Sequence, residues 1–426
     1  MFSFFSRAHV ACFSVWIVIS GASASAGEFP EPRGSLTLAQ AIAAALAQNP
    51  ELQSANYELL AAAGRSAQAG LRPNPEVAVT LENFGGSGAA QGTRILESTL
   101  SLSQVVELGG KRSRRVDVAR FGQDAVTLER DARQLDVLAE VTRRFIQVVA
   151  NQEQLALTRR ATELTESILA VITVRVNAAR SPEVEQNRAS IAVGRARLEV
   201  QRAEYELQTS RRMLAAMWGS IDPAYDSAQA DLYAISPLGS FDALARRLRG
   251  NPDFLRFATE SRLREAELRL AQAQATPSPT VGAGLRRFQE NGDTALVFNF
   301  SMPLPLFDRN QGAIREAEAK RAQVQTDEHA AYIRAHTALF ELYQEVELTR
   351  TEVQTLHGQV IPQAEQALEQ TEYGYQRGRF SYLEMANAQH ELIDLQRAAI
   401  DAATNHYRLA AEIERLTGEP LTPSAR

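Results

Sequence analysis

The 426-residue sequence has a single cysteine, Cys12, and it lies within an apolar run at residues 10–19. Arg7 precedes this run and the small residues 22–26 follow it, an order typical of a secretory signal peptide. An anchor helix is the alternative, but an apolar run of about 10 residues is short for a bilayer of roughly 30 Å. Removal of residues 1–26 would leave an exported chain without a disulfide, a thiol nucleophile or a thiolate metal site.

Long apolar runs and an excess of positive charge are also missing. No later stretch approaches 18 uninterrupted apolar residues, so the sequence predicts no transmembrane helix. With 45% hydrophobic and 23% charged residues, the chain is too charged for a polytopic helical membrane protein and too apolar for a disordered one. The net charge of −6 disfavours nucleic acid as a partner, because nucleic-acid binding needs a basic surface.

No pattern of catalytic or metal-binding residues is present. His329 and His336 share a helix face but lie two turns apart, too far to bind one metal without a third element. His390 and Asp394 have the spacing of an ordinary surface pair. The motifs H-E-x-x-H and G-x-S-x-G and the P-loop are absent from the sequence. We therefore expect no enzyme activity and no cofactor, and an exported hydrolase is disfavoured.

What the sequence does have is an internal repeat. Four short signals recur in the same order about 200 residues later: Asn49-Pro50 as Asn251-Pro252, Pro73 and Pro75 as Pro277 and Pro279, Arg180-Ser181-Pro182 as Arg379-Phe380-Ser381, and Trp218-Gly219 as Thr417-Gly418. This order predicts a duplication, with a first repeat at 36–219, a connector at 220–240, a second repeat at 241–418 and a tail at 419–426.

Both repeats have the same internal order of elements. An Ala- and Leu-rich helical stretch comes first and ends at the spaced prolines. The hydrophobic period then changes to two, which predicts β-hairpins at 76–104 and 280–302, the second turning at Asn291-Gly292. Long helical stretches are predicted at residues 110–178, 183–217, 312–376 and 382–416.

The long helices carry a coiled-coil seam rather than a membrane-spanning surface. Leu138, Val141, Phe145 and Val148 follow the alternating spacing of three and four residues that defines such a seam. A helix of about 65 residues reaches on the order of 100 Å, and it needs neighbouring helices to bury its seam. A filament-like cytosolic coiled coil would also fit this pattern, but it disagrees with the signal peptide and the hairpins.

The four strands, of about 8–11 residues each, have the length of tilted outer-membrane strands. Alternation alone fits equally well a pair of hairpins on a water-soluble helical domain. Four strands cannot close a barrel, and open strand edges are not tolerated in lipid. If the hairpins enter a membrane, several chains must therefore combine their strands, and three chains would supply twelve.

Several segments resemble the TolC-like outer membrane factors. Residues 303–312, with the sequence PLPLFDRNQG, follow the fourth strand as in that family. Their first-repeat equivalent at 106–112 resembles the CzcC-like branch associated with heavy-metal efflux, as does the helix ending at 214–219. Residues 374–389 resemble the most distinctive stretch of the family, the turn between the long helices of the second half. The resemblance covers nearly all of 36–418.

This resemblance implies a mainly α-helical homotrimer with a small β part. Each chain would contribute four strands to one twelve-stranded transmembrane β-barrel in the outer membrane, continued in the periplasm by an α-helical coiled-coil barrel. The implied function is a passive export duct of a tripartite efflux system, reached through a periplasmic adaptor (membrane fusion) protein and an inner-membrane RND pump, for divalent heavy-metal cations. The alternatives are a duct for drug efflux or type I protein secretion, or a periplasmic adaptor, which the duplication argues against.

The resemblance also assigns the helix turns to the periplasmic tip, where the adaptor docks. The implied docking residues are Arg180, Ser181, Gly378, Arg379 and Ser381. Gly378 suits a tight turn between helices, and Ser181 and Ser381 suit the N-caps of the returning helices. Helix capping alone would explain these residues without any partner.

The resemblance implies a channel gate just after the second turn. Glu384 matches an inward-pointing carboxylate, three copies of which would close the channel with a ring that favours cations. Asn387 stands where a second acid is common, which would halve the charge of the ring. Tyr375 matches a tyrosine whose hydrogen bonds help to hold the tip closed, and Phe380 replaces the neighbouring arginine of the family. A solvated glutamate and a tyrosine packed in the core are the alternatives.

Overall fold

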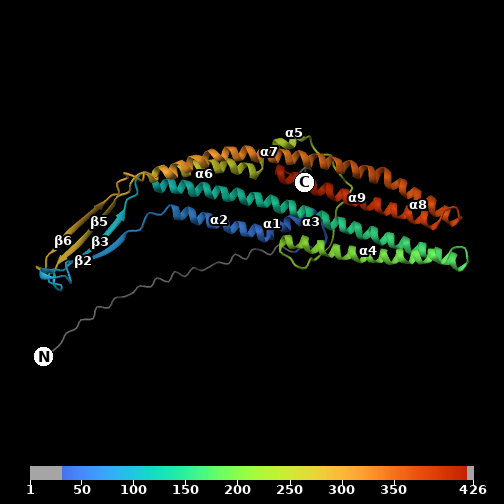
Figure 1. Cartoon of the computed structure of the whole chain (residues 1–426), viewed down its shortest axis with the longest axis horizontal. Coiled ribbons are helices and arrows are strands. Elements are labelled where there is room, and N and C mark those ends of the chain that lie inside the picture. The colour runs from blue at the N-terminus through green and yellow to red at the C-terminus, as the bar shows by residue number, and fades with distance from the viewer. Residues whose placement is uncertain (1–30, 420–426) are drawn as a thin grey trace, which may run out of the picture.

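The computed structural model describes residues 31–419, and the fold is strongly elongated. Strands β2, β3, β5 and β6 lie at one end, and the turns between the long helices lie at the other (Figure 1). The signal peptide predicted at 1–26 and all but the first residue of the tail predicted at 419–426 lie outside the described residues.

Nine α-helices make up most of the described chain. They are α1 (Leu38–Gln48), α2 (Pro50–Ala69), α3 (Lys111–Asn177), α4 (Glu183–Ala215), α5 (Phe241–Arg247), α6 (Pro252–Gln274), α7 (Gln311–Thr355), α8 (Ile361–Gln376) and α9 (Tyr382–Thr417). The predicted long helices agree with α3, α4, α7–α8 and α9, except that a π-helical turn at Leu356–Val360 separates α7 from α8. Within residues 31–419, no helix combines the length and the hydropathy needed to cross a bilayer.

The repeated Asn-Pro signal has the same role in both repeats. Asn49 caps α2 by accepting a hydrogen bond from the amide of Glu51 (2.9 Å), and its Nδ2 donates to the carbonyl of Met217 (2.9 Å). Asn251 caps α6 in the same way and donates to the carbonyl of Leu416 (3.0 Å). Each asparagine thus joins the start of one helix to the end of the returning helix of its own repeat, where an unpaired carbonyl needs a donor.

Two sheets are present in the described chain. Strands β2 (Glu76–Glu82), β3 (Glu97–Val105), β5 (Thr280–Phe288) and β6 (Thr294–Ser301) form an antiparallel sheet in the order β2-β3-β5-β6. Strands β1 (Gly34–Leu36) and β4 (Tyr225–Ala228) form a short parallel pair. Both predicted hairpins are confirmed, and the ladder between β3 and β5 joins the hairpin of one repeat to that of the other.

The register of the four-stranded sheet places apolar residues of all strands on one face. One cross-strand row contains Val79, Leu100, Leu285 and Leu296, which are 68%, 56%, 53% and 86% exposed. Neighbouring positions on the strands form the opposite face, which is largely polar. The chain therefore presents an apolar sheet face that none of its own helices covers, and the outer edges of β2 and β6 have no strand partner within residues 31–419.

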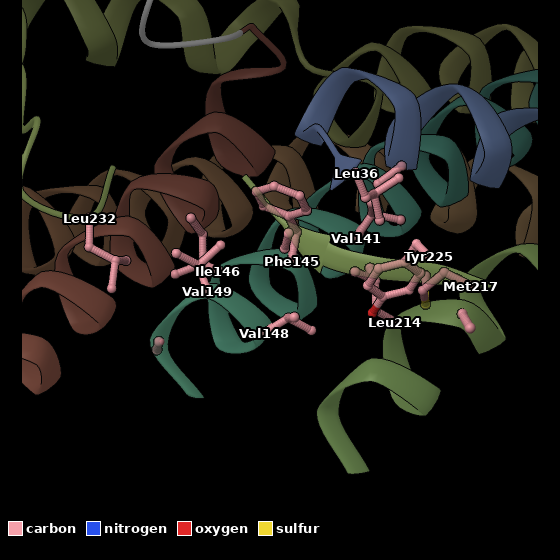
Figure 2. Close-up of a cluster of buried hydrophobic side chains, with 14 of the residues drawn as sticks. Leu36, Val141, Phe145, Ile146, Val148, Val149, Leu214, Met217, Tyr225 and Leu232 are labelled. Carbon is pink, nitrogen blue, oxygen red and sulfur yellow. The ribbon is translucent and has the colours of Figure 1, made fainter. Parts of the chain in front are cut away.

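The main core lies midway along the molecule, around α3. Val141, Phe145 and Val148 of the predicted seam are fully buried. They pack in one cluster with Leu36 of β1 and Tyr225 of β4 (Figure 2). Helix α3 also contacts α2, α4, α6 and α9, so it connects the two repeats along most of their length.

Candidate functional site

The candidate site is the end of the molecule opposite the sheet, where two helix turns lie together (Figure 1). Residues 178–182 connect α3 to α4, and residues 377–381 connect α8 to α9. A buried cluster, which we call the tip cluster, joins the two turns. Its members are Ile168, Ile172, Ala189, Tyr375, Tyr382 and Met385.

The turn of the second repeat ends α8 with a left-handed glycine. Gly378 has φ = +72°, and its amide donates to the carbonyl of Tyr375 (3.0 Å). The amide of Arg379 donates to the carbonyl of Gly374 (2.8 Å). These two bonds form a Schellman motif, which uses the freedom of glycine at positive φ to satisfy the last carbonyls of the helix. The tight turn predicted at Gly378 is confirmed.

Ser381 is the N-cap of α9, as the sequence predicted. Its Oγ accepts from the amide of Glu384 (3.3 Å), and Oε2 of Glu384 accepts from the amide of Ser381 (2.7 Å). Together they form a capping box. The backbone and side-chain hydrogen bonds from Ser381 hold the pKa of Glu384 below its usual value, so its carboxylate is charged at neutral pH. Structurally, Glu384 therefore has a defined role in starting α9.

The predicted N-cap role of Ser181 is wrong. Pro182 is the N-cap of α4, without a side-chain hydrogen bond, and Ser181 lies one position too early. In the duplicated register Pro182 corresponds to Ser381, and Ser181 to Phe380. Pro182 has φ = −76° and ψ = 147°, the extended conformation of an N-cap, and this φ lies in the range that the proline ring allows. The Oγ of Ser181 instead accepts a hydrogen bond from Nε of Arg175 (3.2 Å).

Arg175, in the last turn of α3, connects the two repeats at the tip. Its Nη1 donates to the carbonyl of Tyr375 (3.1 Å), and its guanidinium lies 4.7 Å from the centre of the Tyr375 ring. Arg175 was not predicted from the sequence, because nothing in the local sequence shows which residue of the second repeat an arginine on α3 will reach.

Tyr375 is 3% exposed and lies at the centre of these contacts. Its hydroxyl donates to Oε2 of Glu185 across a distance of 3.4 Å, and burial raises its pKa. Glu185 stands at the third position of α4, as Glu384 does in α9. The duplication was therefore a signal that could have identified Glu185. The two equivalent glutamates differ in role, since Glu185 accepts a bond from the other repeat and Glu384 caps its own helix.

Other predicted residues face solvent. Arg180, Arg379 and Asn387 are exposed, and their side chains form no hydrogen bond or ion pair with residues of the described chain. Asn387 lies one turn after Glu384, on the same side of α9. These three side chains are thus available to a partner.

A groove runs beside the tip between α4 and α9, with α3 as its floor. Its volume is about 370 Å³, and small side chains such as Ala161 and Ala192 line it. Its charged lining residues are Arg188, Arg195, Glu199 and Arg397, the last of which pairs with Asp394 (4.0 Å). An apolar groove flanked by arginines has the chemistry to hold an amphipathic helix that carries acidic residues.

The described residues do not hold a cluster of three or more His, Cys, Asp or Glu side chains that could bind a metal ion. His336 packs against the rings of Phe241 (5.1 Å between centres) and Tyr332 (5.8 Å). This histidine is part of an aromatic cluster at the α5–α6–α7 contact.

The duplicated architecture has a counterpart among known protein families. The model of the outer membrane efflux protein family matches residues 41–220 and again residues 243–419. The chain belongs to the outer membrane efflux protein family. The resemblance to the TolC-like outer membrane factors is confirmed, and this efflux protein resides in the outer membrane with its helical part in the periplasm.

This efflux protein is similar in sequence and in fold to individual members of the family. It is 29% identical over 391 residues to the cobalt-zinc-cadmium resistance protein CzcC of Cupriavidus metallidurans, with 92% of each chain covered. It is 24% identical to the nickel-cobalt-cadmium resistance protein NccC of Alcaligenes xylosoxydans xylosoxydans, over 72% of this chain and 68% of that protein. The crystal structure of CusC shares its fold, with a TM-score of 0.75 at 16% identity over 92% of this chain and 96% of that one.

Proposed function

We propose that this outer membrane efflux protein is the passive export duct of a tripartite efflux system and works as a homotrimer. The observation that carries the proposal is the four-stranded sheet with one uncovered apolar face and two unpaired edges. Lipid accepts the apolar face, but it does not accept unpaired strand edges. Pairing β6 of one chain with β2 of the next removes those edges, and three chains would close a twelve-stranded barrel.

The other end of the duct would meet a periplasmic adaptor, which in turn connects it to an inner-membrane RND pump. The exposed Arg180 and Arg379 and the arginine-flanked groove between α4 and α9 support docking there, since an adaptor helix with acidic residues complements them. The capping contacts of Gly378 and Ser381 would shape this docking surface. Ser181 would contribute through its bond to Arg175.

The gate would lie on α9 beside the tip. Three copies of Glu384, one from each chain, would form a carboxylate ring that favours cations, and Asn387 would line the channel one turn further on. Tyr375 would help to hold the tip closed through its contacts with Arg175 and Glu185.

The cargo we propose is divalent heavy-metal cations. The similarity to CzcC and NccC, which are named for resistance to cobalt, zinc, nickel and cadmium, supports this class of cargo. Conduction requires only weak binding along the duct, so a tight metal site in the chain is not needed.

A growth assay tests the cargo. A strain that lacks this chain should become sensitive to zinc, cobalt or cadmium, and the full-length chain should restore resistance. Unchanged metal tolerance together with sensitivity to drugs would favour the drug-efflux alternative. Loss of a secreted protein would favour type I secretion. A chain that fractionates with the periplasm rather than the outer membrane would favour the adaptor alternative.

A further inference from the structure

Three cations without carboxylate partners gather where the strands meet the helices. Arg72 lies between α2 and β2, and Lys111 and Arg112 begin α3. Within residues 31–419 none of the three forms an ion pair, and we call them the junction collar. Three other cations of this region are paired: Arg65 with Glu58, Arg114 with Asp117, and Arg115 with Glu107.

Backbone and side-chain contacts fix two members of the collar. Nε of Arg112 donates to the carbonyl of Gly70 (2.6 Å), and Nζ of Lys111 donates to Oγ of Ser278 (2.8 Å). A guanidinium has five N–H donors and an ammonium has three, so both keep donors for a ligand. Arg72 is exposed beside them and lines a shallow hollow at the end of α2.

The only carboxylate that lines this hollow does not neutralise the positive charge of the collar. Glu107 pairs with Arg115, whose Nη2 lies 3.0 Å from Oε2, and the hydrogen bond from Arg115 lowers the pKa of Glu107. The same Nη2 also donates to the carbonyl of Leu71 (3.2 Å). Arg115 is therefore occupied with its own carboxylate and the end of α2. Lys111 and Arg112 also lower the pKa of Glu107 by their charge, but one carboxylate against Arg115 and the three collar cations leaves the group positive.

Exposed apolar side chains also lie at the end of the sheet where the strands meet the helices. After β6, Met302, Leu304 and Leu306 are all exposed and alternate with two prolines. Phe307, which follows them, is 91% exposed. On the β3 side, Val106 is also exposed. Basic residues next to exposed apolar and aromatic residues, at the edge of a lipid-facing surface, are typical of a membrane–water interface.

The opposite end of the sheet differs in charge. Near the hairpin turns, Arg286 pairs with Glu82 (3.1 Å) and Glu97 (2.8 Å). Residues 82–97 and 286–293 hold four acidic and three basic residues, so this end has no excess of positive charge, whereas the helix end carries cations without an ion pair. The sheet is thus polarised along the direction in which it would cross a bilayer.

We propose that the junction collar binds the phosphate groups of anionic phospholipids in the periplasmic leaflet of the outer membrane. This proposal rests on the proposed function, because the sheet must lie in the membrane for the collar to reach that leaflet. A lipid, rather than a free phosphate ion, accounts for the apolar residues beside the charges.

Lipid binding by the full-length chain tests the proposal. The probe is a short-chain phosphatidylglycerol added to the purified protein in neutral detergent, with phosphatidylcholine and inorganic phosphate as comparisons. Each basic residue at such a surface changes affinity roughly fivefold, so the variant Arg72→Gln/Lys111→Gln/Arg112→Gln should bind phosphatidylglycerol on the order of 100-fold more weakly. Arg180→Gln/Arg195→Gln/Arg379→Gln, which removes three cations near the tip, should bind as the wild type does.

The single variant Arg72→Gln guards against a folding defect, because Arg72 is exposed and contributes no bond to the described structure. This variant should bind phosphatidylglycerol roughly fivefold more weakly than the wild type. Equal affinity in the collar and tip variants would overturn the proposal, and so would competition by inorganic phosphate as effective as that by the lipid. Reconstitution into bilayers separates the lipid-binding proposal from the proposed function. A wild-type chain that enters no bilayer contradicts the proposed function. A chain that inserts without a preference for anionic lipid contradicts only lipid binding by the collar.

Discussion

Replacement of Arg175 by alanine should loosen the contact between the two turns of the tip. The guanidinium donates to Ser181 and to the carbonyl of Tyr375, and it lies over the Tyr375 ring. A hydrogen bond from a charged donor contributes about 1.5–3 kcal/mol, and an exposed cation–π contact about 0.5–1 kcal/mol. Arg175 is partly exposed, and solvent replaces some of these contacts in the variant. We therefore expect Arg175→Ala to weaken the link between the two turns by about 2 kcal/mol, which is roughly a 30-fold change in the equilibrium constant for holding the turns together.

The effect should appear as more frequent and longer openings of single channels in a planar bilayer, accompanied by a lower Tm. Arg175→Lys keeps the charge but loses the planar group, and it should behave much like the alanine variant. Arg180→Ala is the matched control, because Arg180 lies five residues later and its side chain forms none of these bonds within the described chain. If Arg175→Ala and Arg180→Ala have the same open probability and Tm, the link through Arg175 is refuted.

Three further predictions concern the cap, the sheet and a buried histidine. Ser381→Ala should destabilise the start of α9 by about 1 kcal/mol, because it removes the N-cap. Glu384→Gln keeps the capping box, so it should lower the cation selectivity of the channel without a change in Tm. Unchanged cation selectivity in Glu384→Gln would contradict the proposed gate. Val79→Arg places a charge on the uncovered apolar face at a cost of about 2–4 kcal/mol, so it should remove most of the heat-modifiable trimer from the outer membrane. Ala78→Arg, on the other face of the sheet, should be tolerated. Equal trimer yields from the two variants would argue against the assigned faces. Burial lowers the pKa of His406 below its usual 6.5, so the folded state disfavours its protonation and stability should fall as the pH drops below about 6.5. His406→Asn should flatten the dependence of Tm on pH between about 7.5 and 5.5, and an equally steep profile would rule out this origin.

The elements of the fold could be predicted from the sequence because their hydrophobic periods are long and regular. The seam through Val141, Phe145 and Val148 repeats often enough to define α3, and the structure buries all three residues. The strict alternation in the strands likewise predicts which residues share a face. Duplication strengthened both inferences, since each signal occurs twice. The repeat boundaries and the functional roles of the site residues remain predictions.

The contacts of the tip could not be predicted in the same way. The N-cap of α4 depends on a shift of a single residue in a turn, and the presence of Ser181 beside Pro182 does not show which of them begins the helix. The link from Arg175 to Tyr375 joins residues 200 positions apart in the sequence, and only the packing of α3 against the second repeat brings them together. Periodicity identifies the buried face of a helix, but it does not identify the partner of a particular polar group.

The central claim is that this chain forms a channel through the outer membrane. The most direct measurement is the conductance of the purified full-length protein in a planar lipid bilayer. We predict discrete single-channel steps with a preference for cations, from a trimer whose migration on a gel changes with heating. A water-soluble monomer that produces no conductance would contradict the claim.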